Sequence, residues 1–451
     1  MKTTDLEEVA SKDKVLSPDQ ILNIFKKTRI SRDWNFEGLT PKQTSKLSHC
    51  YHRYPAKFIP QLVEKLMDEY LVGHGPFHVN DLFMGSGTTL VCAITRGYFA
   101  TGTDINYSAE LMTKTKCTPI EPNLLRTRIN KLLEDLDFLN KPSSFWSKKY
   151  RPLVPKSNIG RIEYWFEPKS IEELGVILRR IGYEKDKNVK IFLECCFSHI
   201  LKTCSRWLMS SSKPTIDKNK KMPKPICSFK KHLNKMIRGN EAFWDVVPEN
   251  VRRNINKYLL IKRQDARRQP ATDNSADIQI TSSPYVTSYE YADLHQLTTI
   301  WLAPEVELKE YKKEFIGTSA KSNNMRILKS QIGREIKNEL YKTNKKMADE
   351  VEAFFVDMQE CFDETYRILK HGGRCCYVIG DTKLRGVDIL NAEVFAESMQ
   401  YSGFKIDKII KREIPSKILP TKRDAKTGRF AANHNANSFA YPTEYIVIGR
   451  K

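Results

Sequence analysis

The stretch from residue 78 to residue 94 constrains the fold more than any other part of the chain. The segment HVNDLF at 78–83 is typical of a short buried strand, and the glycines of GSG at 85–87 interrupt it. The apolar run at 88–94 then suits a helix. A strand, a glycine turn and a helix in succession predict an α/β fold of the Rossmann type, because glycines allow the backbone to approach a ligand closely.

A second strand is expected at 99–103, and Asp104 stands at its carboxyl end. A carboxylate in that position can accept hydrogen bonds from both hydroxyls of a ribose. Neither the dinucleotide pattern GxGxxG nor a phosphate-loop lysine accompanies the glycine turn, which argues against a dinucleotide or a nucleoside triphosphate.

The alternation of strands and helices resumes only after a long gap, which indicates an insertion. The alternating strand and helix patterns on both sides of this insertion predict a mostly parallel sheet, whose last two strands could pair as a hairpin. The expected strands are 278–281, 375–379, 404–410 and 445–449, and the expected helices are 18–27, a helix opening after Pro60, 347–370 and 392–401.

Positive charge is the main compositional signal. The chain has 75 Lys and Arg against 54 Asp and Glu, a formal net charge of +21 at pH 7. Between residues 211 and 270 there are 16 Lys or Arg against 5 Asp or Glu, with Phe229, Trp244 and Tyr258 among them. We therefore expect a nucleic-acid partner, with a solvated basic loop as the alternative explanation of this stretch.

The termini and the cysteines exclude other classes. The first residues lack the apolar run of a signal peptide, and no stretch approaches the roughly 18 apolar residues of a membrane-spanning helix, so we expect a soluble, cytoplasmic protein. The ten cysteines lack the spacing of a zinc site, so we expect reduced core thiols and no metal.

Three segments together resemble the amino-methylating DNA methyltransferases. The segment DLFMGSGTT at 81–89 is similar to their cofactor motif, and HRYPAKFIP at 52–60 is similar to the segment that precedes it. The segment TSSPY at 281–285 resembles their catalytic Ser-Pro-Pro-Tyr. Its Ser form points to the cytosine-N4 type, found in restriction-modification systems.

The resemblance implies the cofactor S-adenosylmethionine, a seven-stranded sheet and a role for each matching residue. Ser283 departs from the family pattern, which has its first proline there and thereby stiffens the loop. The implied catalytic residues are Ser282, Ser283, Pro284 and Tyr285. The implied cofactor-binding residues are Tyr54, Pro55, Lys57, Phe58, Asp81, Phe83, Gly85, Ser86, Gly87, Thr88 and Asp104.

The chemistry of such a segment requires acceptors for hydrogen bonds and no covalent nucleophile. The Ser282 hydroxyl and the backbone carbonyl of Ser283 would accept from the amino hydrogens of the base, while Tyr285 would stack on the extruded base. Methylation at cytosine C5 would instead need a cysteine nucleophile, usually in a Pro-Cys pair, and the chain contains no such pair.

Three further residues are candidates with open alternatives. Asp381 follows the expected strand 375–379 and is a candidate for the base pocket, with capping of the next helix as the alternative. Tyr291 and His295 follow the catalytic segment and could shape the acceptor pocket or pack their own helix.

These observations lead to one functional hypothesis: a site-specific methyltransferase acting on the N4 amino group of cytosine in double-stranded DNA, with a cognate restriction endonuclease as possible partner. Adenine N6 as acceptor and a non-catalytic subunit that binds cofactor and DNA are the alternatives. The expected organisation is a lead-in at 1–45, a cofactor-binding half at 46–106, a basic recognition insertion at 107–275 and a catalytic half at 276–451.

Overall fold

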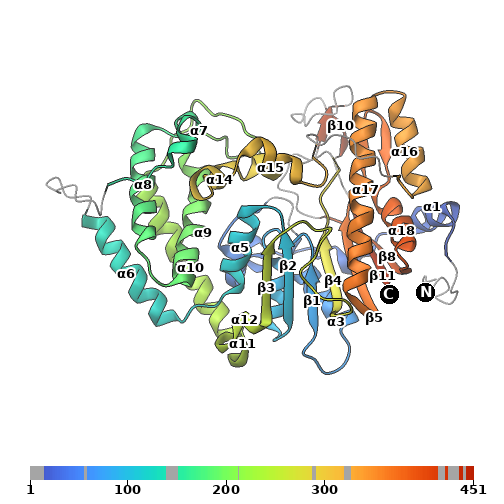
Figure 1. Cartoon of the computed structure of the whole chain (residues 1–451), viewed down its shortest axis with the longest axis horizontal. Helices are drawn as coiled ribbons and strands as arrows, with labels where there is room; N and C mark the ends of the chain where they lie inside the picture. The colour runs from blue at the N-terminus through green and yellow to red at the C-terminus, as the bar shows by residue number, and fades with distance from the viewer. Residues whose placement is uncertain are drawn as a thin grey trace.

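The computed structural model places a seven-stranded sheet at the centre of the molecule (Figure 1). It describes residues 15–54, 58–138, 151–211, 213–286, 291–318, 327–414, 422–424, 436–439 and 443–451. The strand order is β3-β2-β1-β4-β5-β11-β8. The strands are β1 (His78–Asp81), β2 (Phe99–Asp104), β3 (Leu259–Arg263), β4 (Ala276–Ser282), β5 (Leu369–Ile379), β8 (Lys405–Glu413) and β11 (Thr443–Arg450).

The sheet is mostly parallel, as predicted. Only β11 runs antiparallel to its neighbours, β5 and β8. The expected pairing of the last two sheet strands is confirmed, with Ile446 opposite Ile410. The register of the parallel strands places Asp81 of β1 opposite Gly102 of β2, so the polar residues that follow these strands lie at one edge of the sheet.

Strand β3 is a correction to the expected order of elements. The sequence pattern left no strand between 103 and 278, yet β3 pairs with β2 in parallel and forms an edge of the sheet. Only Ile261 of its five residues is buried, so β3 lacks the apolar run of a central strand. The range 107–275 therefore contributes to the sheet as well as to the helical part.

Helices cover both faces of the sheet. On one face, α3 (Pro60–Tyr70) and α4 (Thr88–Thr95) pack on Cys376 and Val378 of β5. On the other face, α16 (Gln331–Tyr341), α17 (Lys345–Ile368) and α18 (Asn391–Tyr401) pack on Cys375 and Tyr377. Successive side chains of a strand point to opposite faces of the sheet, so alternate residues of β5 belong to two different cores. Helix α1 (Pro18–Lys27) lies against α18.

A helical part lies beyond the β3 edge of the sheet, on the left of Figure 1. It has its own apolar core, which includes the buried side chains of Phe192, Phe229, Trp207 and Trp301. Its helices are α6 (Pro122–Phe138), α7 (Ile159–Trp165), α8 (Pro168–Gly182), α9 (Lys187–Cys204), α10 (Pro225–Val246) and α14 (Gln296–Leu302). Helix α5 (Tyr107–Cys117) lies between this part and the sheet, where it contacts β2, β3 and α9. Phe243, near the end of α10, joins the core under the sheet and so links the two parts.

The shorter elements connect these layers. They are η2 (Arg32–Trp34), α2 (Pro41–Thr44), η3 (Leu47–Cys50), η4 (Lys156–Asn158), α11 (Glu249–Arg253), α12 (Ile255–Tyr258), α13 (Tyr291–Leu294), α15 (Leu308–Glu314), β6 (Thr382–Leu384), β7 (Val387–Ile389), β9 (Lys422–Asp424) and β10 (Ala436–Phe439). All ten cysteines are free thiols, and eight of them are buried. Within the described ranges, every helix is too short or too polar to cross a bilayer.

Candidate functional site

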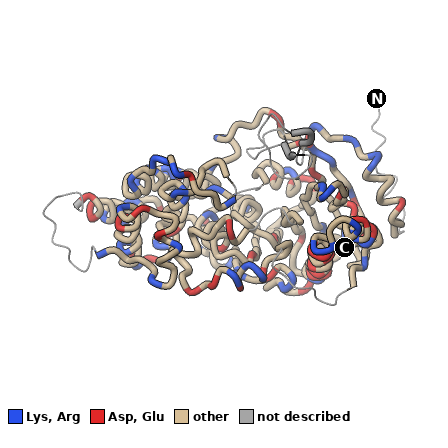
Figure 2. The backbone as a smooth tube through the Cα atoms, turned by 90° about the horizontal axis from the view of Figure 1, so that it is seen from above, with Lys and Arg blue, Asp and Glu red and all other residues tan. Residues whose placement is uncertain are grey.

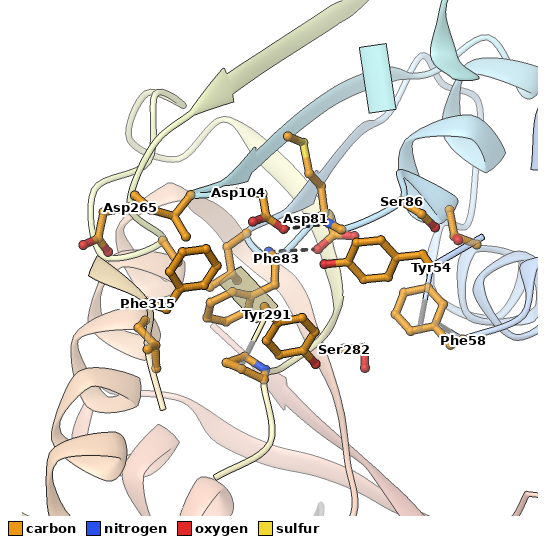
Figure 3. Close-up of a pocket in the computed structure, with 18 of the residues that line it drawn as sticks. Tyr54, Phe58, Asp81, Phe83, Ser86, Asp104, Asp265, Ser282, Tyr291 and Phe315 are labelled. Atoms are coloured by element: carbon orange, nitrogen blue, oxygen red, sulfur yellow. Dashed lines mark hydrogen bonds between the residues drawn. The ribbon is translucent and has the colours of Figure 1, made fainter. Parts of the chain in front are cut away.

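A cavity opens at the carboxyl ends of β1, β2 and β4 (Figure 3). It brings together side chains that lie far apart in the sequence. Eight of the predicted cofactor residues line it: Tyr54, Phe58, Asp81, Phe83, Gly85, Ser86, Thr88 and Asp104. From the catalytic segment, Ser282 and Pro284 line the same cavity.

The glycine turn has the conformation that only glycine adopts readily. Gly85 has φ +48° and Gly87 has φ +77°. A Cβ atom on Gly85 would lie 3.1 Å from Cε1 of Tyr54, and one on Gly87 would lie 2.8 Å from Cγ2 of Thr113. Gly85 therefore permits Tyr54 to approach the turn. Gly87 does not line the cavity; it is the N-cap of α4, and its N–H donates to the carbonyl of Met84 at 2.6 Å.

Asp81 connects the cofactor turn to the catalytic strand. Its Oδ1 accepts from the Phe83 N–H at 3.1 Å and from the Thr281 hydroxyl at 2.6 Å. Thr281 immediately precedes Ser282, so the carboxylate fixes both segments at the floor of the cavity. Burial raises the pKa of the Asp81 carboxyl to about 6, against the hydrogen bonds that favour its charged form.

Asp104 is held in place by the backbone. Its Oδ2 accepts from the Gly85 N–H at 3.0 Å and its Oδ1 from the Asn106 N–H at 2.8 Å. Burial raises the pKa of Asp104 to about 7, although both hydrogen bonds lower it. Each oxygen keeps a second lone pair, which is available to a ligand.

Tyr54 forms a wall of the cavity and is supported from behind. Its ring stacks on the His295 ring with centroids 5.0 Å apart and planes at 24°, and on Tyr291 at 6.4 Å and 21°. Tyr291 itself lines the cavity, whereas His295 is not among the lining residues. Burial lowers the pKa of His295 to about 4, so the imidazole is neutral. Tyr291 thus shapes the pocket, and His295 packs behind Tyr54.

Several lining residues were missed by sequence reasoning. Asp265 and Ala266 follow β3, and they were missed because the strand itself was missed. Phe315 and Ile316 follow α15, which no motif marks. The complete set of additional lining residues is Leu82, Met84, Ile105, Asp265, Ala266, Glu314, Phe315 and Ile316.

Tyr311 of α15 secures this last wall. Its hydroxyl donates to the carbonyl of Ile105 at 3.0 Å and accepts from the Tyr107 N–H at 2.7 Å. Ile105 directly follows Asp104, and Tyr107 is the first residue of α5. Phe315, four residues after Tyr311 in the chain, lines the cavity. The hydroxyl therefore joins the segment that carries Phe315 to the loop that carries Asp104.

The other predicted catalytic residues have different surroundings. Ser283 is only 2% exposed, and among the described residues its Oγ has no hydrogen-bond partner. Tyr285 does not line the cavity, and its ring lies near the end of β5: a Cβ on Gly380 would be 3.6 Å from its Cε1. Pro55 and Lys57 lie outside the described residues.

Asp381 acts at the start of a helix. Its Oδ1 accepts from the Ala392 N–H at 3.1 Å, within the first turn of α18, and it does not line the cavity. Burial raises the pKa of Asp381 to about 6. The geometry thus supports helix capping, the alternative to a base-pocket role.

The cavity wall is acidic although the chain is basic. Asp81, Asp104, Asp265 and Glu314 line it, and no Lys or Arg is among its described lining residues. A wall of this charge disfavours polyphosphate ligands. It suits a ligand that carries positive charge and hydroxyl or amine donors.

Comparison with known proteins gives three methyltransferase relatives, while no protein-family model matches the chain. The Type II methyltransferase M.MvaI of Kocuria varians is 26% identical over 422 residues, which cover 88% of this chain and 91% of the relative. The relatives M.MjaII of Methanocaldococcus jannaschii and M.BsoBI of Geobacillus stearothermophilus are 24% and 22% identical. Their alignments cover 70% and 87% of this chain, and 74% and 86% of the relatives.

Among solved structures, an S-adenosylmethionine-dependent methyltransferase from Methanosarcina mazei aligns with 89% of this chain and 98% of its own, at 9% identity and a TM-score of 0.28. The strand order, the acidic cavity at the sheet edge and the sequence relatives support a Rossmann-like methyltransferase.

Proposed function

We propose that this protein is an S-adenosylmethionine-dependent DNA methyltransferase that modifies the N4 amino group of cytosine in double-stranded DNA, as the modification enzyme of a restriction-modification system. One observation carries the proposal. The predicted cofactor residues Asp81 and Asp104 and the predicted catalytic residue Ser282 line a single acidic cavity. The relatives named Type II methyltransferases support DNA as the substrate.

The cavity fits the cofactor by its charge and by its free polar atoms. S-adenosylmethionine, when bound, supplies an electrophilic methyl group on a positively charged sulfur. Asp104 would accept the ribose hydroxyls. The Asp265 carboxylate, which already accepts from Arg267 Nε at 2.9 and 3.1 Å, would accept from the amino group of adenine with a remaining lone pair. Ser86 Oγ is buried and has no hydrogen-bond partner in the part of the chain that the structure describes, so a polar group of the ligand would satisfy it. The rings of Tyr54 and Phe315 provide apolar walls.

The catalytic segment would act on the extruded base by accepting hydrogen bonds. Ser282 Oγ and the carbonyl of Ser283 would accept the amino hydrogens and so increase the electron density on the attacking nitrogen. Pro284 lines the cavity next to them. Tyr285 would stack on the base after it leaves the duplex. The Ser at position 282 favours cytosine N4 over adenine N6.

Identification of the methylated nucleoside tests the proposal. The purified protein is incubated with labelled S-adenosylmethionine and mixed-sequence duplex DNA, and the digested nucleosides are separated by mass spectrometry. N4-methylcytosine is the expected product. Detection of N6-methyladenine would show that the acceptor is adenine N6 and not cytosine N4. Bound cofactor without any methylated DNA would favour a non-catalytic subunit.

Ser282→Ala separates catalysis from cofactor binding. We expect a fall in turnover of about 10- to 100-fold, the equivalent of one hydrogen bond of roughly 1.5–3 kcal/mol in the transition state. The dissociation constant for S-adenosylmethionine should remain within about twofold. Ser275→Ala is a matched control, since its hydroxyl donates to the Thr272 carbonyl outside the cavity. An unchanged turnover would remove Ser282 from the mechanism.

The partners follow from the same proposal. Residues 107–275 are proposed as the region that recognises the target sequence, because they combine the helical part with much of the positive charge. Figure 2 shows that Lys and Arg are interspersed with Asp and Glu in both parts of the molecule, so the DNA contact must be sought in local clusters. A restriction endonuclease that cuts the same target is the expected genetic partner.

A further inference from the structure

A group of basic side chains gathers where the helical part meets the segment before Tyr54. His52 and Arg53 belong to that segment, His199 to α9, and His232 and Lys235 to α10. A ring nitrogen of His52 lies 3.0 Å from the Ser198 hydroxyl, and one of His232 lies 2.7 Å from the Tyr51 carbonyl. These hydrogen bonds fix the positions of two of the three imidazoles.

The three imidazole rings are uncharged and pack together beneath the cationic side chains of this cluster. The rings of His199 and His232 stack at 3.6 Å with planes at 5°, and the His52 ring meets His199 edge-on at 5.2 Å. Burial lowers the pKa of His52 to about 3 and that of His232 to about 4. The lasting positive charge therefore belongs to Arg53 and Lys235.

Arg53 and Lys235 are exposed and, within the described part of the chain, neither forms an ion pair. Both lie close enough to lower the pKa of His199 and of His232, after the larger effect of burial on each ring. Arg53 also lowers the pKa of Lys202, again after burial. Lys202 is half-buried, and its Nζ already donates to the carbonyls of Met209 and Ser211 at 3.3 and 2.9 Å, so Arg53 and Lys235 are the cations that face solvent here. No carboxylate contributes to the pKa of either histidine.

Close packing holds the backbone that carries these cations in place. A Cβ on Gly239 of α10 would lie 2.8 Å from Cys50 Sγ and 2.9 Å from the Leu47 carbonyl, so the helix rests directly on residues 47–51. Lys235 is one helical turn before Gly239. The next residue after Arg53 is Tyr54, which lines the cavity. The cationic cluster consequently adjoins the cavity wall.

We infer that Arg53 and Lys235 form a binding site for one backbone phosphate of the DNA, next to the nucleotide that enters the cavity. The inference rests on the proposed function. Unpaired cations on a packed framework suit a phosphate oxygen, and such contacts position a duplex without reading its sequence. A phosphate held there would fix the strand beside the extruded base.

The salt dependence of DNA binding tests this site. Binding of a fluorescent mixed-sequence duplex is measured by anisotropy over a series of salt concentrations, for the wild type and for R53Q/K235Q. We expect the slope of log affinity against log salt to fall by about 1, with an affinity loss of about tenfold or more at low salt. The matched control is K187Q, because Lys187 is an exposed residue about 18 Å from His199 along α9.

The outcomes separate the phosphate site from the proposed function. A reduced slope in R53Q/K235Q with a wild-type slope in K187Q supports the site. An unchanged slope in R53Q/K235Q, while the wild type methylates DNA, overturns the phosphate site alone. A wild type that neither binds nor methylates duplex DNA overturns both proposals. Unfolding curves and S-adenosylmethionine titrations on each variant confirm that its fold is intact.

Discussion

Asp104→Asn should make the cofactor-free protein more stable at pH 8 and at the same time weaken its binding of S-adenosylmethionine. Burial raises the pKa of Asp104 from its ordinary 3.8 to about 7. Because its pKa is raised in the folded state, the Asp104 carboxyl contributes fully to the stability of the fold below pH 3.8, and this contribution is lost as the pH rises to about 7. At 1.36 kcal/mol for each pKa unit, the ionised group destabilises the folded state by at most about 4 kcal/mol above that pH.

The Asn side chain in this variant carries no charge, which removes the cost of burying an ionised group, but its amide has a single oxygen. One of the backbone N–H groups of Gly85 and Asn106 then loses its acceptor, which costs roughly 1–3 kcal/mol. The expected net change in the free energy of unfolding is a gain of about 1–3 kcal/mol at pH 8 and a loss at pH 4. Urea unfolding at both values measures it.

Cofactor binding should change in the opposite direction. Hydrogen bonds from ribose hydroxyls to a charged acceptor contribute about 1.5–3 kcal/mol, so the affinity of Asp104→Asn should fall about 10- to 100-fold at pH 8. The wild type should lose up to about tenfold in affinity for each pH unit below 7, and the variant should not show this loss.

Calorimetric titration of S-adenosylmethionine from pH 5.5 to 8.5 compares the two proteins, with Asp245→Asn as a control at an exposed carboxylate. Parallel pH profiles for wild type and Asp104→Asn would refute the assignment of Asp104 to the ribose. An unchanged affinity of the variant at pH 8 would refute it as well.

Three further outcomes are expected. Gly85→Ala should lower cofactor affinity about tenfold, because its Cβ would push the Tyr54 ring. Gly386 also has a positive φ but open space around it, so Gly386→Ala should lose only about 1–2 kcal/mol of stability and keep its cofactor affinity; equal cofactor affinities of the two variants would contradict this. Tyr311→Phe should raise the KM for the cofactor several-fold with little change in kcat, and a fall in kcat alone would speak against its positioning role. Burial lowers the pKa of His232 to about 4, so between pH 6.5 and 4 only the unfolded chain binds a proton at this residue, and the folded state loses stability as the pH falls. His232→Gln should reduce that loss by up to about 1.4 kcal/mol per pH unit, which urea unfolding at several pH values measures.

Much of the sheet and one side of the cavity could be predicted from local sequence signals. The turn at 85–87 requires glycine, and the structure has positive φ at Gly85 and Gly87. Strand β5 ends in the continuous apolar run at 375–379, β4 has apolar residues at alternate positions 276, 278 and 280, and α17 has a clear apolar face. Asp104 could be predicted as a cavity residue because it ends a strand next to the glycine turn.

Other parts depended on contacts between distant segments. Strand β3 buries one residue of five at the edge of the sheet, so its pattern is weak, and Asp265 was missed with it. Phe315 lines the cavity on a segment that Tyr311 joins to Ile105 and Tyr107, about 200 residues earlier in the chain. Asp381 stands at a strand end, as a site residue would, but the backbone of α18 takes its carboxylate.

The sequence by itself therefore determined the α/β class, the glycine turn and the residue types that face a ligand, because these follow from backbone sterics and from the periodicity of burial. The tertiary structure alone decided which side chains share the cavity, which carboxyls have raised pKa values and which cations remain unpaired. Those properties depend on neighbours far away in the chain, whose positions are fixed only when the separate cores pack together.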